Sequence, residues 1–160
     1  MAGEIGHIPM KVDGELCNCG HRGCLETLAS ATAIAREGAK AGLKSPKGEN
    51  FPLTAETVFN LVKIGDLTAK KVVDTMVDWF ARGLAMAANL LNPDVIVIGG
   101  GLVHAGDTLF QPLERLFRAY TLNRVTDSCR LLQAELGSNA GMLGAARIAW
   151  QTTKEDESKK

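Results

Sequence analysis

The sequence predicts an α/β fold whose strands run parallel. The run Val95–Ile98 is continuously apolar and β-branched, as in a strand covered on both faces, and it ends in Gly99–Gly101. A second strand-like run, Leu131–Leu136, leads into the turn Gly137–Gly141 and then a small-residue helix through Ala149. Because the order strand, glycine turn, helix occurs twice, we expect parallel strands connected by helices.

The composition narrows the class of protein. The chain has 160 residues, 46% of them hydrophobic, which is enough for one compact core. Basic and acidic side chains both number 18, so no net positive field attracts nucleic acid or anionic lipid. No apolar run approaches the roughly 20 residues of a membrane span, and the first residues do not resemble a signal peptide. We expect a cytoplasmic protein with no nucleic-acid or membrane partner, in which reduced cysteines favour a metal site over disulfides.

The first elements follow from local patterns. Residues 4–10 alternate loosely between polar and apolar, which predicts a strand, and Pro9 restricts it to an edge or an end. The segment Lys11–Gly23 has no hydrophobic period, so its order would have to come from something other than a hydrophobic face, such as a bound ion. Residues 26–40 are rich in alanine and predict one helix. The Ser-Pro, Lys-Gly and Phe-Pro pairs within residues 44–52 predict an exposed loop.

Two helices are predicted in the middle of the chain. Thr54 is suited to cap a helix over residues 55–63, and Asp66 or Thr68 to cap a longer helix that ends before Asn92-Pro93. The longer helix has an apolar stripe made of Val73, Met76, Val77, Phe80, Leu84, Ala87 and Leu91.

The last part of the chain predicts a helix over Leu109–Tyr120 with Pro112 near its first turn. Residues 152–160 contain no apolar side chain, so we expect a disordered polar tail after a folded lobe of residues 1–151.

A cluster of thiols is the strongest chemical signal. Cys17, Cys19 and Cys24 lie close in the chain, and Gly20 and Gly23 between them permit the tight loop that would bring the three sulfur atoms to one ion. Zinc suits such ligands. The spacing differs from that of zinc fingers, so the pattern alone leaves ordinary reduced thiols as the alternative.

A tetrahedral zinc ion needs a fourth ligand, and either His7 or His21 could supply it. Cys129 stands in a different element and is better interpreted as a small buried hydrophobic residue.

Several motifs together resemble the ROK family, which contains bacterial sugar kinases and related repressors. The resemblance lies in Ala2–His7, in Cys17–Thr27 with Ser30, in Asn92–Gly101 and in Gly137–Ala146. It covers residues 2–150 and implies the C-terminal lobe of a ribonuclease H-like (actin-like ATPase) sugar kinase without the first strands of that lobe.

The resemblance also implies roles for individual residues. It makes His7, Cys17, Cys19 and Cys24 the zinc ligands, in a zinc loop over residues 7–24, and it makes Glu4, His7 and Glu26 the sugar-binding residues. Carboxylates accept hydrogen bonds from hydroxyl groups, and an imidazole can give one nitrogen to zinc and the other to a sugar hydroxyl.

Both acidic residues also have simpler interpretations. Glu4 could be a solvated strand residue, and Glu26 could be an acid favoured by the dipole at a helix N-terminus.

Gly99, Gly100 and Gly101 are the candidate nucleotide-binding residues. Backbone amides in such a turn can approach a phosphate or a ribose closely, but a tight connection between strand and helix explains the same glycines, and the resemblance favours ATP. Close helix packing equally explains Gly137, Gly141 and Gly144.

The resemblance implies a parent protein that transfers phosphate from Mg-ATP to the 6-hydroxyl of glucose or a related hexose, and that forms a homodimer. Its Asp-x-Gly-Gly-Thr phosphate segment and its general-base aspartate are expected in an N-terminal part. No catalytic residue is assigned in this chain, which we predict to be inactive alone. The alternatives are the sugar-sensing lobe of a ROK repressor and a non-catalytic zinc-stabilised interaction module.

Overall fold

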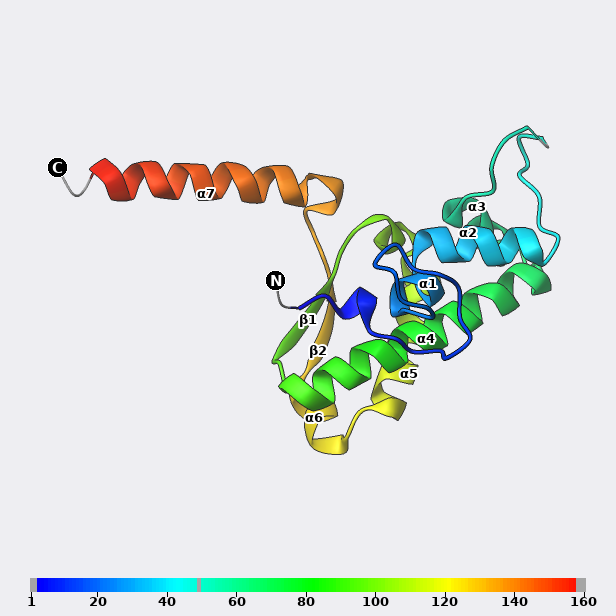
Figure 1. Ribbon diagram of the computed structural model, residues 1–160, viewed down its shortest axis with the longest axis horizontal. Coiled ribbons are helices and arrows are strands. Elements are labelled where there is room, and N and C mark those ends of the chain that lie inside the picture. Colours follow the sequence, from blue (N-terminus) through cyan, green and yellow to red (C-terminus); the bar gives the residue numbers. More distant parts are fainter. Residues whose placement is uncertain (1–2, 49, 158–160) are drawn as a thin grey trace.

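The computed structural model describes residues 3–48 and 50–157 (Figure 1). The helices are α1 (Leu25–Leu28), α2 (Ala31–Lys40), α3 (Ala55–Lys63), α4 (Leu67–Leu91), α5 (Asp107–Tyr120), α6 (Asn123–Ser128) and α7 (Ala140–Glu157). Short 3-10 helices are η1 (Ile5–His7), η2 (Gly101–Ala105) and η3 (Gly137–Asn139), and the strands are β1 (Val95–Ile98) and β2 (Arg130–Gln133).

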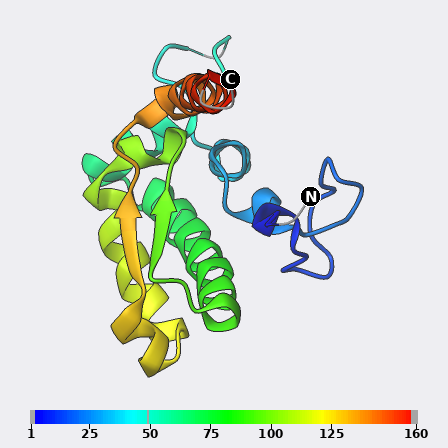
Figure 2. The ribbon, with the colours of Figure 1, turned by 90° about the vertical axis from the view of Figure 1, so that its left-hand side faces the viewer.

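The strands β1 and β2 form a parallel pair, in which Val95 lies opposite Arg130 and Ile98 opposite Gln133. This confirms the α/β class and the parallel direction. Helices α4 and α5 lie on one face of the pair (Figure 2). The expectation that Val95–Ile98 is covered on both faces is wrong, because the side chain of Val97 is 60% exposed. Within the described residues, β1 has a helix layer on one face only.

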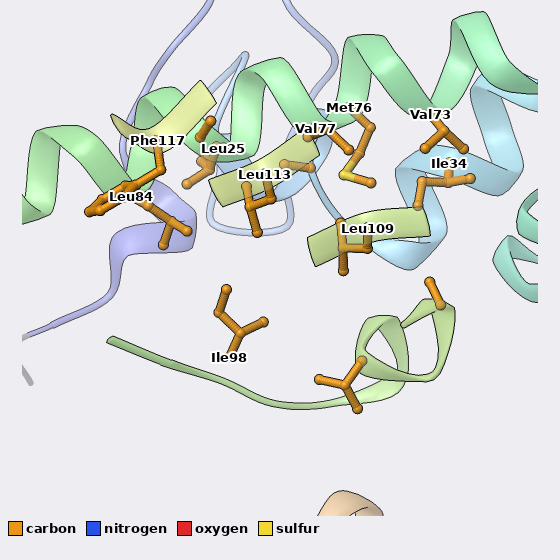
Figure 3. Close-up of a cluster of buried hydrophobic side chains, with 14 of the residues drawn as sticks. Leu25, Ile34, Val73, Met76, Val77, Leu84, Ile98, Leu109, Leu113 and Phe117 are labelled. Atoms are coloured by element: carbon orange, nitrogen blue, oxygen red, sulfur yellow. The ribbon is translucent and has the colours of Figure 1, made fainter. Parts of the chain in front are cut away.

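The core lies between α4, α5 and the sheet, and α1 and α2 extend it (Figure 3). Its large buried side chains include Leu25, Ile34, Val73, Met76, Val77, Leu84, Ile98, Leu109, Leu113 and Phe117. The apolar stripe predicted for the long helix is confirmed over most of its length. Leu91, in the last turn, is instead 72% exposed.

Capping residues define the two central helices as predicted. The Thr54 hydroxyl accepts the N–H of Thr57 at 3.2 Å, and the Asp66 carboxylate accepts the N–H of Ala69 at 2.8 Å. Each bond satisfies a backbone donor that the first helical turn leaves without a partner. Asp66 therefore caps α4. The helix ends at Asn92, which adopts the left-handed conformation with φ 45° just before Pro93.

Two predictions for the first forty residues are wrong. Residues 4–10 do not form a strand: η1 occupies Ile5–His7, and only Pro9 makes an isolated antiparallel bridge, with Cys24. The single helix expected over residues 26–40 is broken, because the chain leaves helical geometry at Ala29 and Ser30 restarts it by accepting the N–H of Ala33 at 3.1 Å. A serine that competes for backbone donors favours such a restart.

At the other end, α7 extends away from the body of the molecule (Figure 1) and continues to Glu157. Residues 152–157 are thus helical where the sequence predicted a disordered tail, and residues 158–160 lie outside the described part. No helix in the described ranges is long and apolar enough to cross a bilayer.

Candidate metal and sugar site

The loop between η1 and α1, residues 8–24, contains the three clustered cysteines and is called the cysteine loop. It folds back on itself through backbone hydrogen bonds. The N–H groups of Met10 and Lys11 both donate to the carbonyl of Gly23, at 2.8 and 3.1 Å, and the N–H of Gly23 donates to the carbonyl of Glu15 at 2.9 Å. The N–H of Leu25 then donates to the carbonyl of Ile8 at 2.9 Å. These bonds hold the beginning of the loop against its end, so that ligands far apart in sequence meet.

Two glycines make this crossing possible. Gly23 has φ +66°, and a Cβ there would lie 1.7 Å from the carbonyl oxygen of Lys11. A Cβ on Gly14 would lie 2.3 Å from the Cα of Gly23. Only glycine fits at either position. The sequence indicated Gly23 as a loop residue, but the need for glycine at Gly14 arises from a contact across the loop and has no local signal.

Within the described residues, the crossing assembles one His/Cys cluster. One ligand atom from each of four side chains lies within 4.8 Å of every other; the four are His7, Cys17, Cys19 and Cys24. The Sγ of Cys17 lies 3.5 Å from the Nδ1 of His7, and the Sγ atoms of Cys19 and Cys24 are 3.6 Å apart. Around a tetrahedral zinc ion, such pairs would be separated by about 3.5 to 3.8 Å. The donor set and the separations of these two pairs fit zinc.

His21 approaches the same cluster from outside. Its Nδ1 lies 3.5 Å from the Sγ of Cys19, and both residues are exposed. Cys17 and Cys24 are buried. Cys129, also buried, belongs to the hydrophobic core, as the sequence predicted.

The thiols differ in acidity. Hydrogen bonds to the backbone and then the side chain of His21 lower the pKa of Cys19 to about 6. Burial raises the pKa of Cys24 to about 12. Zinc binds thiolates, so an ion that reaches Cys24 has to displace a proton, and metal affinity should rise with pH.

Glu26 stands beside the cluster, in the first turn of α1. Its Oε2 lies 3.5 Å from the Nδ1 of His7 and 3.8 Å from the Sγ of Cys17. Its side chain is 46% exposed and can therefore still reach a ligand. A Cβ on Gly6 would lie 3.6 Å from the Cβ of Glu26, which shows how closely η1 packs on α1. Glu4 precedes η1 and is exposed.

The glycines predicted to bind nucleotide lie elsewhere, at the carboxyl end of β1. Gly100 has φ +80° and nothing within 4 Å of an added Cβ, whereas a Cβ on Gly99 would lie 3.5 Å from the Cβ of Ala134. The turns after β1 and β2 are therefore neighbours. Gly101 also lines a cavity of about 490 Å³ between α3 and η2. Figure 2 shows the cysteine loop and the two strands on opposite sides of α4.

The comparison with known families agrees with the resemblance seen in the sequence. The profile of the ROK family matches residues 1–152. The chain belongs to the ROK family.

Relatives of two kinds share this ROK domain. A glucokinase from Halalkalibacterium halodurans is 44% identical over 159 residues, which are 94% of this chain and 48% of that protein. The transcriptional regulator NagC of Escherichia coli is 33% identical over 137 residues, covering 84% of this chain and 34% of the regulator.

A crystal structure of a ROK family glucokinase from Streptomyces griseus, in complex with glucose and AMPPNP, has a TM-score of 0.81 at 30% identity. The alignment covers 94% of this chain and 52% of that one. The chain thus spans about half the length of the glucokinases it matches.

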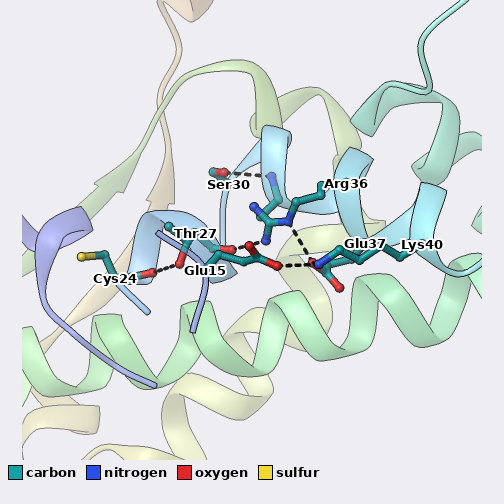
Figure 4. A network of polar contacts seen from close by, with 8 residues as sticks. Glu15, Cys24, Thr27, Ser30, Arg36, Glu37 and Lys40 are labelled. Carbon is teal, nitrogen blue, oxygen red and sulfur yellow. Dashed lines mark hydrogen bonds and ion pairs between the residues drawn. The ribbon is translucent and has the colours of Figure 1, made fainter. Parts of the chain in front are cut away.

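A polar network between α2 and the cysteine loop was not predicted from the sequence (Figure 4). It joins Glu15 and Thr27 to three residues of α2, namely Arg36, Glu37 and Lys40. The predicted alanine-rich helix contained all three, but nothing in its spacing indicated that they face the loop.

Proposed function

We propose that this ROK domain is the zinc- and sugar-binding part of an ATP-dependent glucokinase. The observation that carries the proposal is the convergence of His7 with the thiols of Cys17, Cys19 and Cys24, with Glu26 at hydrogen-bonding range of the same cluster. The likeness to glucokinases over almost the whole chain supports glucose as the sugar and ATP as the phosphate donor.

In this proposal His7 has two tasks. Its Nδ1 faces Cys17 and Glu26, so one ring nitrogen can enter the metal site while the other is left for a sugar hydroxyl. Glu26 and Glu4 accept hydrogen bonds from further hydroxyl groups. Bound zinc would supply a fixed anchor for the loop and a fixed orientation for the imidazole.

Nucleotide binding is assigned to the other side of α4. Gly99, Gly100 and Gly101 are exposed and lie at the carboxyl end of β1, beside the turn after β2; phosphates are commonly bound at such strand ends. In the whole protein we propose that Mg-ATP lies at this edge. The whole protein is proposed to be a cytoplasmic homodimer.

Phosphoryl transfer depends on positioning and charge stabilisation, and the acceptor hydroxyl also needs a base. Neither Glu4 nor Glu26 is assigned that role. We expect the 160-residue chain to bind glucose but not to phosphorylate it, which a coupled ATP-to-ADP assay would test. Glucose-dependent turnover by the purified chain would contradict this part of the proposal.

Sugar binding is tested by calorimetric titration of the zinc-loaded chain with glucose. Glu26→Gln should weaken binding roughly tenfold or more, because a charge-assisted hydrogen bond is lost. Glu56→Gln is the matched control, since Glu56 also lies in the first turn of a helix. Equal affinity of the two variants would favour the helix-dipole interpretation of Glu26 and contradict a sugar contact.

A ROK repressor is the second candidate, favoured by the likeness to NagC. The chain would then sense a sugar without any phosphoryl transfer, and the longer protein would contain a helix-turn-helix. The N-terminal sequence of that protein distinguishes kinase from repressor. Zinc binding without affinity for glucose or N-acetylglucosamine would instead favour an interaction module.

A further inference from the structure

We propose that Arg36 and Lys40 are positioning residues that hold the cysteine loop and α1 in their binding geometry. Both stand on α2, outside the cluster of ligands, and each makes one bond to a different part of the loop and α1. The positioning role is inferred from these contacts alone. Any effect of the two residues on sugar affinity depends on the proposed function.

Arg36 fixes the position of α1. Its guanidinium donates to the carbonyl oxygen of Thr27 at 2.6 Å, and the Thr27 hydroxyl donates to the carbonyl of Cys24 at 2.8 Å. Thr27 is buried and follows Glu26 directly. The two bonds therefore connect α2 to a proposed metal ligand on one side and to a proposed sugar ligand on the other.

Lys40 holds the first half of the loop. Its ammonium group donates to the Glu15 carboxylate at 2.6 Å, across 25 positions of sequence. The backbone carbonyl of Glu15 accepts the N–H of Gly23, which precedes Cys24. Lys40 thus acts on the same crossing that brings the thiols together. The hydrogen bond from Lys40 also lowers the pKa of the Glu15 carboxyl.

Glu37 restricts the side chains of Arg36 and Lys40. Its Oε1 accepts from the Nε of Arg36 at 2.9 Å and from the Nζ of Lys40 at 3.1 Å. A shared acceptor limits the rotamers of both long side chains, so less entropy is lost when each bonds to the loop. Figure 4 shows this row of contacts from Thr27 to Lys40.

Hydrogen exchange of the loop amides tests the positioning role directly, without metal or sugar. Arg36→Ala should accelerate exchange over residues 10–28 roughly tenfold, because it removes the hydrogen bond that a charged donor makes to Thr27 in α1. Lys40→Ala should accelerate it roughly two- to fivefold, as for an exposed pair. In a Glu15→Gln background, Lys40→Ala should add less than twofold, because the cross-loop ion pair is already broken.

The matched controls remove similar pairs that do not touch the loop. Arg118 bonds to Glu114 through Nε and Nη2, and Lys70 bonds to Asp74 on α4. Arg118→Ala and Lys70→Ala should leave loop exchange within twofold of the parent. If Arg36→Ala and Lys40→Ala behave like these controls, or if they accelerate the amides of α5 as much as those of the loop, the proposal is wrong.

Cobalt(II) titration provides a second readout, since cobalt in a thiolate site is visible by absorption. Arg36→Ala and Lys40→Ala should each bind cobalt roughly three- to tenfold more weakly than the parent, as expected for groups that orient metal ligands. Unchanged cobalt affinity together with unchanged loop exchange would overturn the proposal. Failure of the parent chain to bind cobalt would instead reject the proposed metal site, and loop exchange would still decide the positioning role.

Discussion

The tight crossing at Gly23 allows a quantitative test of how the cysteine loop is built. In Gly23→Ala the new Cβ would lie 1.7 Å from the Lys11 carbonyl oxygen, a distance at which the backbone has to move by more than an ångström. The Gly23 carbonyl, which accepts the N–H groups of Met10 and Lys11, lies next to the moving atoms. The substitution therefore strains the residue and separates the two arms of the loop.

The expected cost combines two effects. A residue with a Cβ at φ +66° costs about 1–2 kcal/mol. Loss of the two hydrogen bonds to the Gly23 carbonyl costs about 1 kcal/mol each. Together these raise the free energy of forming the loop by about 3–4 kcal/mol, and metal affinity should fall by a few hundredfold, on the order of 10² to 10³.

The variant Gly20→Ala separates the cost of the left-handed backbone conformation from the cost of the collision with Lys11. Gly20 has φ +91°, which disfavours alanine in the same way, but nothing lies within 4 Å of an added Cβ. We expect about 1 kcal/mol and less than a tenfold loss of metal affinity for this variant. The assays are zinc competition against a chromophoric chelator and urea unfolding of the metal-loaded chain. If both variants lose the same affinity, the collision with Lys11 has no part in the effect and the reasoning is refuted.

Three further predictions concern the cluster, the core and pH. Cys24→Ser should abolish stoichiometric zinc binding, measured by mass spectrometry under native conditions, whereas Cys129→Ser should retain it because Cys129 belongs to the core. Leu113→Ala should lower the free energy of unfolding in urea by about 3 kcal/mol, since Leu113 is fully buried; a loss below about 1 kcal/mol would contradict its place in the core. Burial alone would raise the pKa of Asp78, but hydrogen bonds to Arg82 and a tyrosine lower it overall. This carboxylate therefore stabilises the fold above its unfolded pKa and ceases to do so as pH falls through its lower folded pKa, so Asp78→Asn should lose less stability than the parent between about pH 5 and pH 2. Parallel stability curves for the two proteins would exclude that contribution.

Periodicity predicted the parts of the fold in which one face of an element decides its structure. The long helix was recognisable because its apolar side chains recur at helical spacing, and its cap at Asp66 follows a local rule. The strand at Val95–Ile98 was recognisable from its β-branched run, but not the exposure of its second face. Exposure depends on which elements lie against the strand, and local sequence does not determine this.

The errors in the first forty residues have a related cause. Residues 4–10 alternate like a strand, yet no continuous partner strand pairs with them among the described residues, and the chain turns through η1 to place His7 at the cluster. Tertiary context overrides propensity in such short segments. Spacing alone left His7 and His21 as equal candidates for the fourth ligand, and the resemblance favoured His7. The structure places His7 within 4.8 Å of all three thiols.

The proposed sugar site is also held from the side of the core, through a contact between α1 and α4. Leu25 is 4% exposed, and a Cβ on Gly83 would lie 2.3 Å from the Cδ2 of Leu25, so α4 provides a gap in which this side chain sits. Glu26 follows Leu25 directly, so the contact between Leu25 and α4 also fixes the position of Glu26. Gly83→Ala should therefore displace Glu26 as well as lower stability. Glucose affinity and zinc stoichiometry measured on the same sample separate these effects. Weaker sugar binding with full zinc occupancy is expected, because Leu25 moves α1 and disturbs only its own loop bond, to Ile8, whereas the three backbone bonds of Gly23 involve neither Leu25 nor Gly83.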